Sequence, residues 1–146
     1  MKRRELHIGT ISEGTLIPEE IGDSLAWDLE RLRLTRDERK TVNEYRRFRD
    51  LEGSEAEDGL SVDELVSELE NIADAHCPPY TYYGSLDGDG ACFGVWPITD
   101  GEDLERYPAG ESPNGSGDCY EVTDHGNLSC GRRLKNGRWV EYWSVV

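Results

Sequence analysis

Four cysteines and three histidines are the side chains of this sequence best suited to metal binding or nucleophilic chemistry. Cys119 and Cys130 flank a turn that holds Asp124 and His125, so these four residues could form a small metal site or an activated thiol. No two cysteines have the C-x-x-C spacing typical of zinc sites, and nothing near them indicates an oxyanion hole. We therefore expect no metal, no cofactor and no catalytic residue, with the Cys/His site as an alternative.

A second candidate motif is the acidic run Asp87-Gly88-Asp89-Gly90, which resembles the opening of a calcium-binding loop. The next two positions that such a loop requires are occupied by Ala91 and Cys92, and no glutamate closes the twelve-residue frame. The run is also a strong turn sequence. We interpret it as a turn between two strands.

The third group of reactive side chains is a set of carboxylates on one predicted helix. Ser61 and Glu64 have the spacing of a capping box, and apolar residues at helical spacing follow them up to residue 73. The other side of this helix holds acids and no lysine, although like charges four residues apart cost a few tenths of a kcal/mol. We interpret this side as a functional acidic surface. The carboxylates expected to bind a partner are Asp63, Glu64, Glu68, Glu70 and Asp74, with Glu55, Glu57 and Asp58 of the preceding loop assisting.

The distribution of charge along the chain supports that interpretation. The 146 residues have a net charge of −15, and residues 51–125 alone contain 19 acidic side chains and one basic one, Arg106. Such a surface argues against direct binding to nucleic acid or to an anionic membrane, and it favours a basic partner. Solubility alone is the competing explanation.

The remaining elements must position these carboxylates. Pro18 and the acids after it are typical of a helix start, and Thr35 and Glu38 have capping-box spacing before a second helix. The basic residues of that second helix alternate with acids, so we expect a solvated, salt-bridged surface there. Residues 52–60 are acidic and small, which predicts a mobile loop.

Strand signals dominate the sequence after residue 79. Aromatic runs lie on both sides of the Asp87–Gly90 turn, and Asn136-Gly137 predicts a hairpin between residues 128–135 and 138–146. The expected fold is α+β, with three N-terminal helices packed on one face of a C-terminal antiparallel sheet. We expect one domain over residues 1–146, with a helical half at about 15–76 and a sheet half at about 79–146.

Four short motifs resemble a group of small accessory proteins encoded by bacteriophages and mobile elements. They are Arg4–Ser12, Pro79–Pro97 with its Gly-Asp-Gly-x-x-Phe-Gly-x-Trp-Pro pattern, Val122–Leu128 with Asp-His-Gly-Asn, and the final Trp-Ser-Val-Val. The resemblance implies an accessory gene product that acts in the cytoplasm of a bacterial host. It implies no catalytic residue.

The sequence as a whole predicts a binding protein and not an enzyme. We expect an acidic inhibitor that occupies a basic, nucleic-acid-binding surface of a host protein, as an anti-restriction or anti-CRISPR protein would, by nucleic-acid mimicry. The alternatives are the metal-binding protein above and a small adaptor that self-associates, for instance as a dimer, through exposed aromatics such as Trp139 and Trp143. A cytoplasmic location is expected because the basic N-terminus precedes no apolar stretch and no apolar run approaches about 20 residues.

Overall fold

A computed structural model describes residues 3–51, 61–98 and 104–146, and it divides the chain into two compact units. The first unit comprises Met1–Cys77 and Thr81–Pro97, and the second comprises Pro78–Tyr80 and Ile98–Val146. The border between the two units therefore differs from the border that the sequence suggested between a helical half and a sheet half. It runs instead through the segment that was expected to form one sheet.

Three helices form the larger part of the first unit: α1 (Pro18–Leu29), α2 (Arg36–Asp50) and α3 (Val62–Ala75). The predicted capping box of α2 is confirmed, because the Thr35 side chain accepts a hydrogen bond from the Glu38 amide and the Glu38 carboxylate accepts one from the Thr35 amide. At α3, Ser61 caps the Glu64 amide at 3.3 Å. Both helices thus begin where the sequence placed them.

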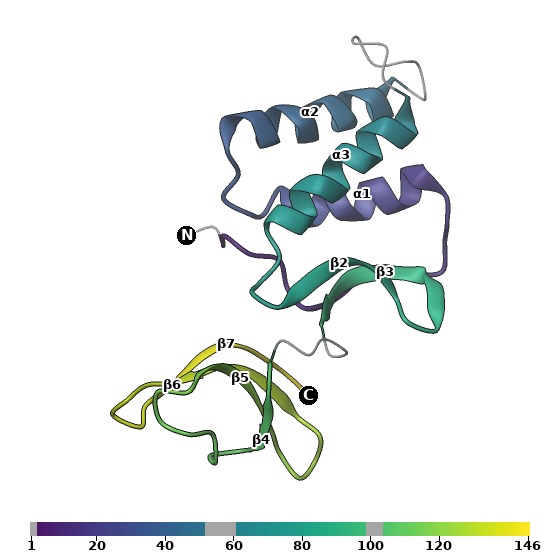
Figure 1. Cartoon of the computed structure of the whole chain (residues 1–146). Coiled ribbons are helices and arrows are strands. Elements are labelled where there is room, and N and C mark those ends of the chain that lie inside the picture. The colour runs from purple at the N-terminus through teal and green to yellow at the C-terminus, as the bar shows by residue number, and fades with distance from the viewer. Residues whose placement is uncertain (1–2, 52–60, 99–103) are drawn as a thin grey trace. The chain divides into compact units, whose positions relative to one another are not determined.

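The first unit also contains a three-stranded antiparallel sheet with the order β1-β3-β2. Its strands are β1 (Gly9–Ser12), β2 (Thr81–Leu86) and β3 (Asp89–Pro97). The helices lie on one side of this sheet, with α1 against β1 and α3 against β2 (Figure 1). The core between the layers consists of apolar side chains from all three helices, among them Leu25, Val42, Tyr45 and Leu65, together with Val95 of β3.

The second unit is a four-stranded sheet with the order β4-β5-β6-β7. Its strands are β4 (Arg106–Pro108), β5 (Gly117–Val122), β6 (Leu128–Arg133) and β7 (Trp139–Val145). β4 pairs with β5 in parallel, and the other neighbours are antiparallel. The predicted hairpin about Asn136-Gly137 is confirmed as β6–β7.

The predicted α+β class is confirmed, but the predicted architecture is wrong in two respects. The helices are not all N-terminal to the sheet, since β1 precedes them and pairs with β3 from beyond them. The strands also form two sheets and not one, and the second sheet contains a parallel pair. β3 pairs with β2 on one edge, and β1 pairs with the other edge that β2 leaves open.

A buried charged network holds the second unit together. Glu121 of β5 accepts hydrogen bonds from Arg133 at 2.8 Å, from the Gly110 amide at 2.9 Å and from the amide and hydroxyl of Ser112. The side chains of Arg133 and Glu121 are only 14% and 7% exposed. Arg133 also donates to the Gly137 carbonyl and lies over the Trp139 ring. These bonds tie the loop before β5 to the hairpin after it.

The second unit also binds a segment from the middle of the chain. Tyr80 and Tyr142 each donate a hydrogen bond to the Asp118 carboxylate at 2.5 Å, and Trp143 donates to the Pro79 carbonyl at 2.6 Å. Tyr80 has a positive φ of 61°, which a bulky residue adopts only when its surroundings impose it. The two tyrosine hydroxyls lower the pKa of Asp118.

Candidate functional site

The candidate site is the solvent side of α3, which the packing of the helix defines. Five residues of α3 are buried against the rest of the first unit, namely Leu65, Val66, Leu69, Ile72 and Ala73. Because they occupy one side of the helix, residues on the other side must face solvent. The buried leucines and the Ser61 cap fix both the direction and the start of α3.

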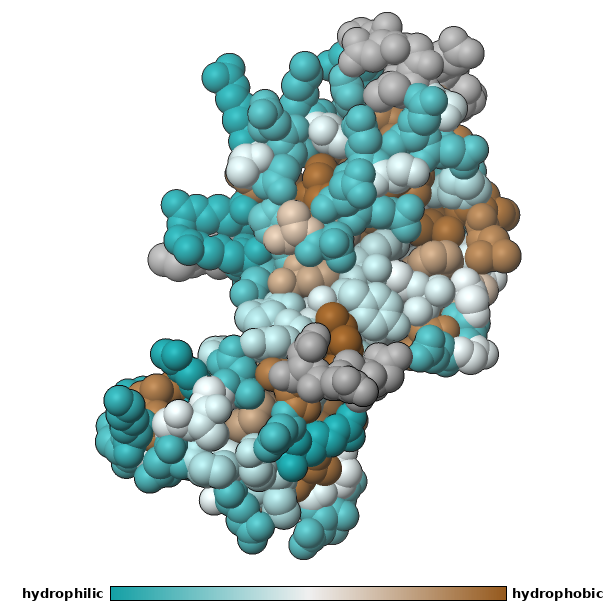
Figure 2. Space-filling view, viewed as in Figure 1, coloured by the Kyte–Doolittle hydropathy of each residue, from teal (hydrophilic) through white to brown (hydrophobic). Residues whose placement is uncertain are grey.

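Four of the five predicted carboxylates of α3 are exposed: Asp63, Glu64, Glu68 and Asp74. We call these four residues the acidic face. The helical repeat places Glu64 and Glu68 one turn apart, and Asp63 and Asp74 three turns apart, about 16 Å along the axis. Hydrophilic side chains cover the visible surface over α2 and α3 in Figure 2.

Glu70 does not belong to the acidic face. Its side chain is half-buried, and burial raises the pKa of its carboxyl, an effect that the Tyr83 hydroxyl partly offsets. Helical geometry explains the difference, since residue 70 lies at the border of the apolar side, between Val66 and Ala73. The three loop carboxylates that were expected to assist, Glu55, Glu57 and Asp58, lie outside the described residues.

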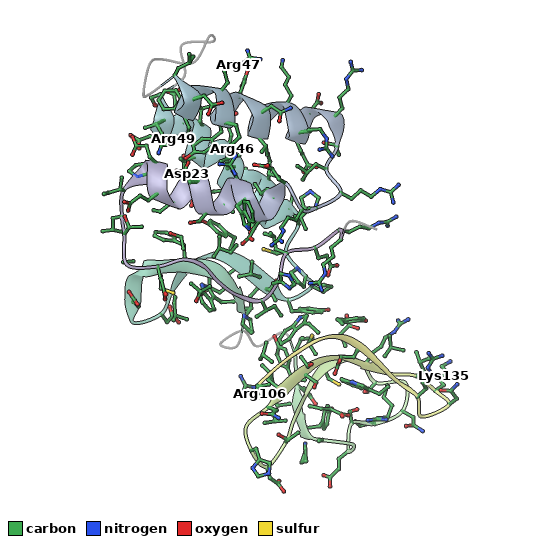
Figure 3. The ribbon with its side chains drawn as sticks, turned by 180° about the vertical axis from the view of Figure 1, so that it is seen from behind. Asp23, Arg46, Arg47, Arg49, Arg106 and Lys135 are labelled. Carbon is green, nitrogen blue, oxygen red and sulfur yellow. The ribbon has the colours of Figure 1, made fainter. Side chains whose placement is uncertain are left out.

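The acidic face has no cation beside it in the part of the chain that the structure describes, in contrast to three carboxylates of the first unit. Asp23 pairs with Arg49 at 3.0 Å, Glu30 with Arg46 at 2.6 Å and Glu38 with His76 at 2.8 Å. Figure 3 shows Asp23 of α1 facing Arg46 and Arg49 of α2. Within residues 3–51, 61–98 and 104–146, no ion pair includes a residue of the acidic face.

The ion pairs of α2 also differ from the pattern expected from sequence. Arg46 and Arg49 form ion pairs across the helix interface, with Glu30 at the C-cap of α1 and with Asp23 of α1. Burial alone would raise the pKa of Asp23, but hydrogen bonds from Arg49 and Tyr45 outweigh it and lower the pKa. The basic side chains nearest to the helix interface thus serve to join α1 and α2.

The residues of the alternative Cys/His site do not converge on a metal centre. Cys119 and Cys130 are buried in β5 and β6, whereas Asp124 and His125 are exposed in the turn between these strands. Across the part of the chain that the structure describes, no group of three or more His, Cys, Asp or Glu side chains is placed to hold a metal ion. Burial raises the pKa of Cys130 to about 12 and also raises that of Cys119, which makes both thiols poor nucleophiles.

The aromatic residues proposed for self-association are less exposed than expected. Strict alternation along β7 placed Trp139, Glu141 and Trp143 on one face, but the pairing register shifts between Cys130 and Gly131, opposite Glu141 and Trp143. Glu141 is consequently exposed while Trp143 is buried. A β-bulge in this position reverses the alternation.

Acidification is expected to destabilise both units. The folded-state pKa values of Asp23 and Glu38 in the first unit, and of Asp118 and Glu121 in the second, lie below their ordinary values of 3.8 for Asp and 4.5 for Glu. For Glu121, burial would raise the pKa, but hydrogen bonds from Ser112, Gly110 and Arg133 outweigh it. A lowered pKa contributes stability that is complete above the ordinary value and is lost as the pH falls through the folded value.

Urea unfolding between pH 7 and pH 2, followed by amide exchange in each unit, measures this loss. We expect the free energy of unfolding to fall mainly below pH 4.5. In the Glu121→Gln variant the pH dependence of the second unit should shrink, while that of the first unit should not change. Equal stability at pH 7 and pH 3 in the unmodified protein would contradict the assignment.

Comparisons with known proteins identify no relative of this chain: no family model, no curated protein and no solved structure matches it. Among the described helices, none is both long and apolar enough to cross a bilayer. The function must therefore be argued from the charge and geometry of the chain itself.

Proposed function

We propose that this chain is an acidic accessory protein of a bacteriophage or mobile element that inhibits a basic, nucleic-acid-binding protein of its bacterial host. The observation that carries the proposal is the acidic face, four exposed carboxylates on one rigid helix with no cation beside them in the described residues. The proposed target is a nuclease of the restriction or CRISPR type. The protein acts by binding in the host cytoplasm, without a reaction or a cofactor of its own.

The physical basis of the proposal is that carboxylates can replace phosphates as partners of arginine and lysine. Charge-assisted hydrogen bonds between a guanidinium and a carboxylate have the same fork geometry as those to a phosphate. A face whose counterions are only solvent ions releases water and those ions on binding, whereas Asp23 or Glu30 would also have to release its own arginine. The packed leucines of α3 hold the carboxylates in place before the partner arrives.

The experiment is inhibition of DNA cleavage by a panel of purified restriction and CRISPR nucleases at 50, 150 and 500 mM NaCl. We expect inhibition of at least one nuclease, with an affinity that falls steeply as salt rises. The double reversal Glu64→Lys/Glu68→Lys should weaken that inhibition by about 30-fold or more, since losing buried charge pairs costs at least about 2 kcal/mol.

The matched control is Glu13→Lys/Glu111→Lys, which changes the net charge equally at two exposed loop positions. This control should retain most of the inhibition. Equal loss in both double variants would show that only total charge matters, and unchanged inhibition in Glu64→Lys/Glu68→Lys would exclude the acidic face. A panel without any inhibited nuclease would remove the proposal.

Self-association is a second candidate, favoured by large apolar side chains on the surface of the first unit. Leu16 is 69% exposed and Trp27 of α1 is 60% exposed. Association through these residues would persist at high salt, in contrast to binding through the acidic face. Light scattering at 50 and 500 mM NaCl, with Trp27→Ser as the test variant, separates the two.

A further inference from the structure

A pocket of about 430 Å³ lies in the first unit, at the C-terminal end of α3. Three segments that are distant in sequence surround it: the N-terminal segment around Arg4, the connection between α1 and α2, and the end of α3. The polar side chains in its lining belong to Arg4, Glu5, Arg33, Thr35, His76 and Cys77. The volume falls in the range of small-molecule sites.

Backbone hydrogen bonds hold the three segments together. The Leu6 amide donates to the His76 carbonyl at 2.9 Å, and the Arg33 amide donates to the Arg3 carbonyl at 2.6 Å. The His76 ring bridges the Arg4 carbonyl at 2.7 Å and the Glu38 carboxylate at 2.8 Å. The walls of the pocket are therefore fixed by main-chain contacts and by the hydrogen bonds of the partly buried His76 ring.

The charged side chains of the pocket favour an anion. The guanidinium groups of Arg4 and Arg33 form no ion pair with any residue that the structure describes, and Glu5 is the one carboxylate in the lining. Glu38, which lies close by, is paired with His76. Arg4 and Arg33 line the same pocket without an ion-pair partner among the described residues, and the guanidinium fork matches the oxygens of a phosphate or carboxylate.

We propose that this pocket binds a small oxyanion that carries two or more negative charges on phosphate or carboxylate groups. Arg4 and Arg33 supply the charge, and the Thr35 hydroxyl supplies a further hydrogen-bond donor. The site adjoins Asp74 at the end of the acidic face, but the proposal does not depend on the proposed inhibition of a nuclease.

Cys77 provides a direct readout of occupancy. It lines the pocket and is half-buried, whereas the other three cysteines are buried. Burial, with a smaller contribution from Asp74, raises the pKa of the Cys77 thiol to about 11, so alkylation is slow enough to follow by hand. Iodoacetamide labelling of the full chain at pH 8.5, quantified for the Cys77 peptide by mass spectrometry, measures access to the pocket.

We expect 10 mM pyrophosphate or citrate to slow Cys77 labelling at least fivefold relative to NaCl of equal ionic strength. Protection by pyrophosphate alone assigns the site to phosphates, protection by citrate alone assigns it to carboxylates, and protection by both supports the shared chemistry. Equal labelling rates in NaCl and in both anions would overturn the proposal.

Variants test whether the two arginines are responsible. Arg33→Glu and Arg4→Glu should each abolish protection, whereas Arg138→Glu, an equal charge change at an exposed position of the second unit, should retain it. Circular dichroism checks folding, and Arg33→Gln replaces Arg33→Glu if the latter unfolds. Undiminished protection in the folded Arg33 and Arg4 variants would show that the guanidiniums do not bind the anion.

Discussion

Replacing Glu121 with alanine is expected to lower the free energy of unfolding of the second unit by about 3–5 kcal/mol, the usual cost of breaking a buried ion pair. The carboxylate accepts bonds from Arg133, from two backbone amides and from the Ser112 hydroxyl. Without it, a buried guanidinium and these donors lose their acceptor. Denaturant unfolding followed by amide exchange in β5, β6 and β7 measures the effect.

Two controls define what such a loss means. Glu141→Ala removes an exposed carboxylate from β7 of the same sheet and should change stability by less than about 0.5 kcal/mol. The double variant Glu121→Leu/Arg133→Met removes both charges and should be less destabilised than Glu121→Leu alone, the remaining loss coming from the Gly110 and Ser112 donors that still lack an acceptor. A loss below about 1 kcal/mol in Glu121→Ala would show that the network is not a stabilising feature of the sheet.

The Gly22→Ala variant should destabilise the first unit by about 3 kcal/mol, although alanine normally favours a helix over glycine by about 1 kcal/mol. A Cβ at position 22 would lie 2.7 Å from Cε2 of Tyr45, closer than atoms can approach. Tyr45 is fully buried, and its hydroxyl donates to the Glu19 carbonyl and to Asp23. The ring can move away only by giving up these bonds.

The control for this prediction removes the ring. In a Tyr45→Leu background the added methyl group has no phenol to meet, so Gly22→Ala should become neutral or stabilising there. Thermal unfolding of the four proteins of this cycle gives the coupling energy between positions 22 and 45. A stabilising Gly22→Ala in the unmodified background would show that α1 and α2 pack less closely than the structure indicates.

Local signals predicted the helices and the last hairpin well. The apolar spacing and caps of α2 and α3 are contained within single segments, and the Asn136-Gly137 turn determines its own hairpin. Sheet partnership is different, because it depends on pairing between distant strands. Nothing near Gly9–Ser12 indicates that β1 pairs with β3, and the three residues of β4 are too few to give a periodic signal.

In the candidate site, too, the sequence predicted only what depends on one local segment. Periodicity was sufficient to place Asp63, Glu64, Glu68 and Asp74 on the exposed side of α3, since burial of the leucines determines their direction. It could not place Glu70, because a residue at the border of a helix face depends on the neighbouring strand β2. The pocket around Arg4 and Arg33 depends on three distant segments, so no local pattern could reveal it.

Pro78–Tyr80 is synthesised before the strands of the second unit that it contacts. These three residues are made between α3 and β2, yet their partners Asp118 and Trp143 follow at least 38 residues later. On the ribosome, the first unit can assemble while this tripeptide still lacks the contacts that impose the positive φ of Tyr80. Strands β5 and β7, which are synthesised later, therefore complete the contacts of Pro79 and Tyr80.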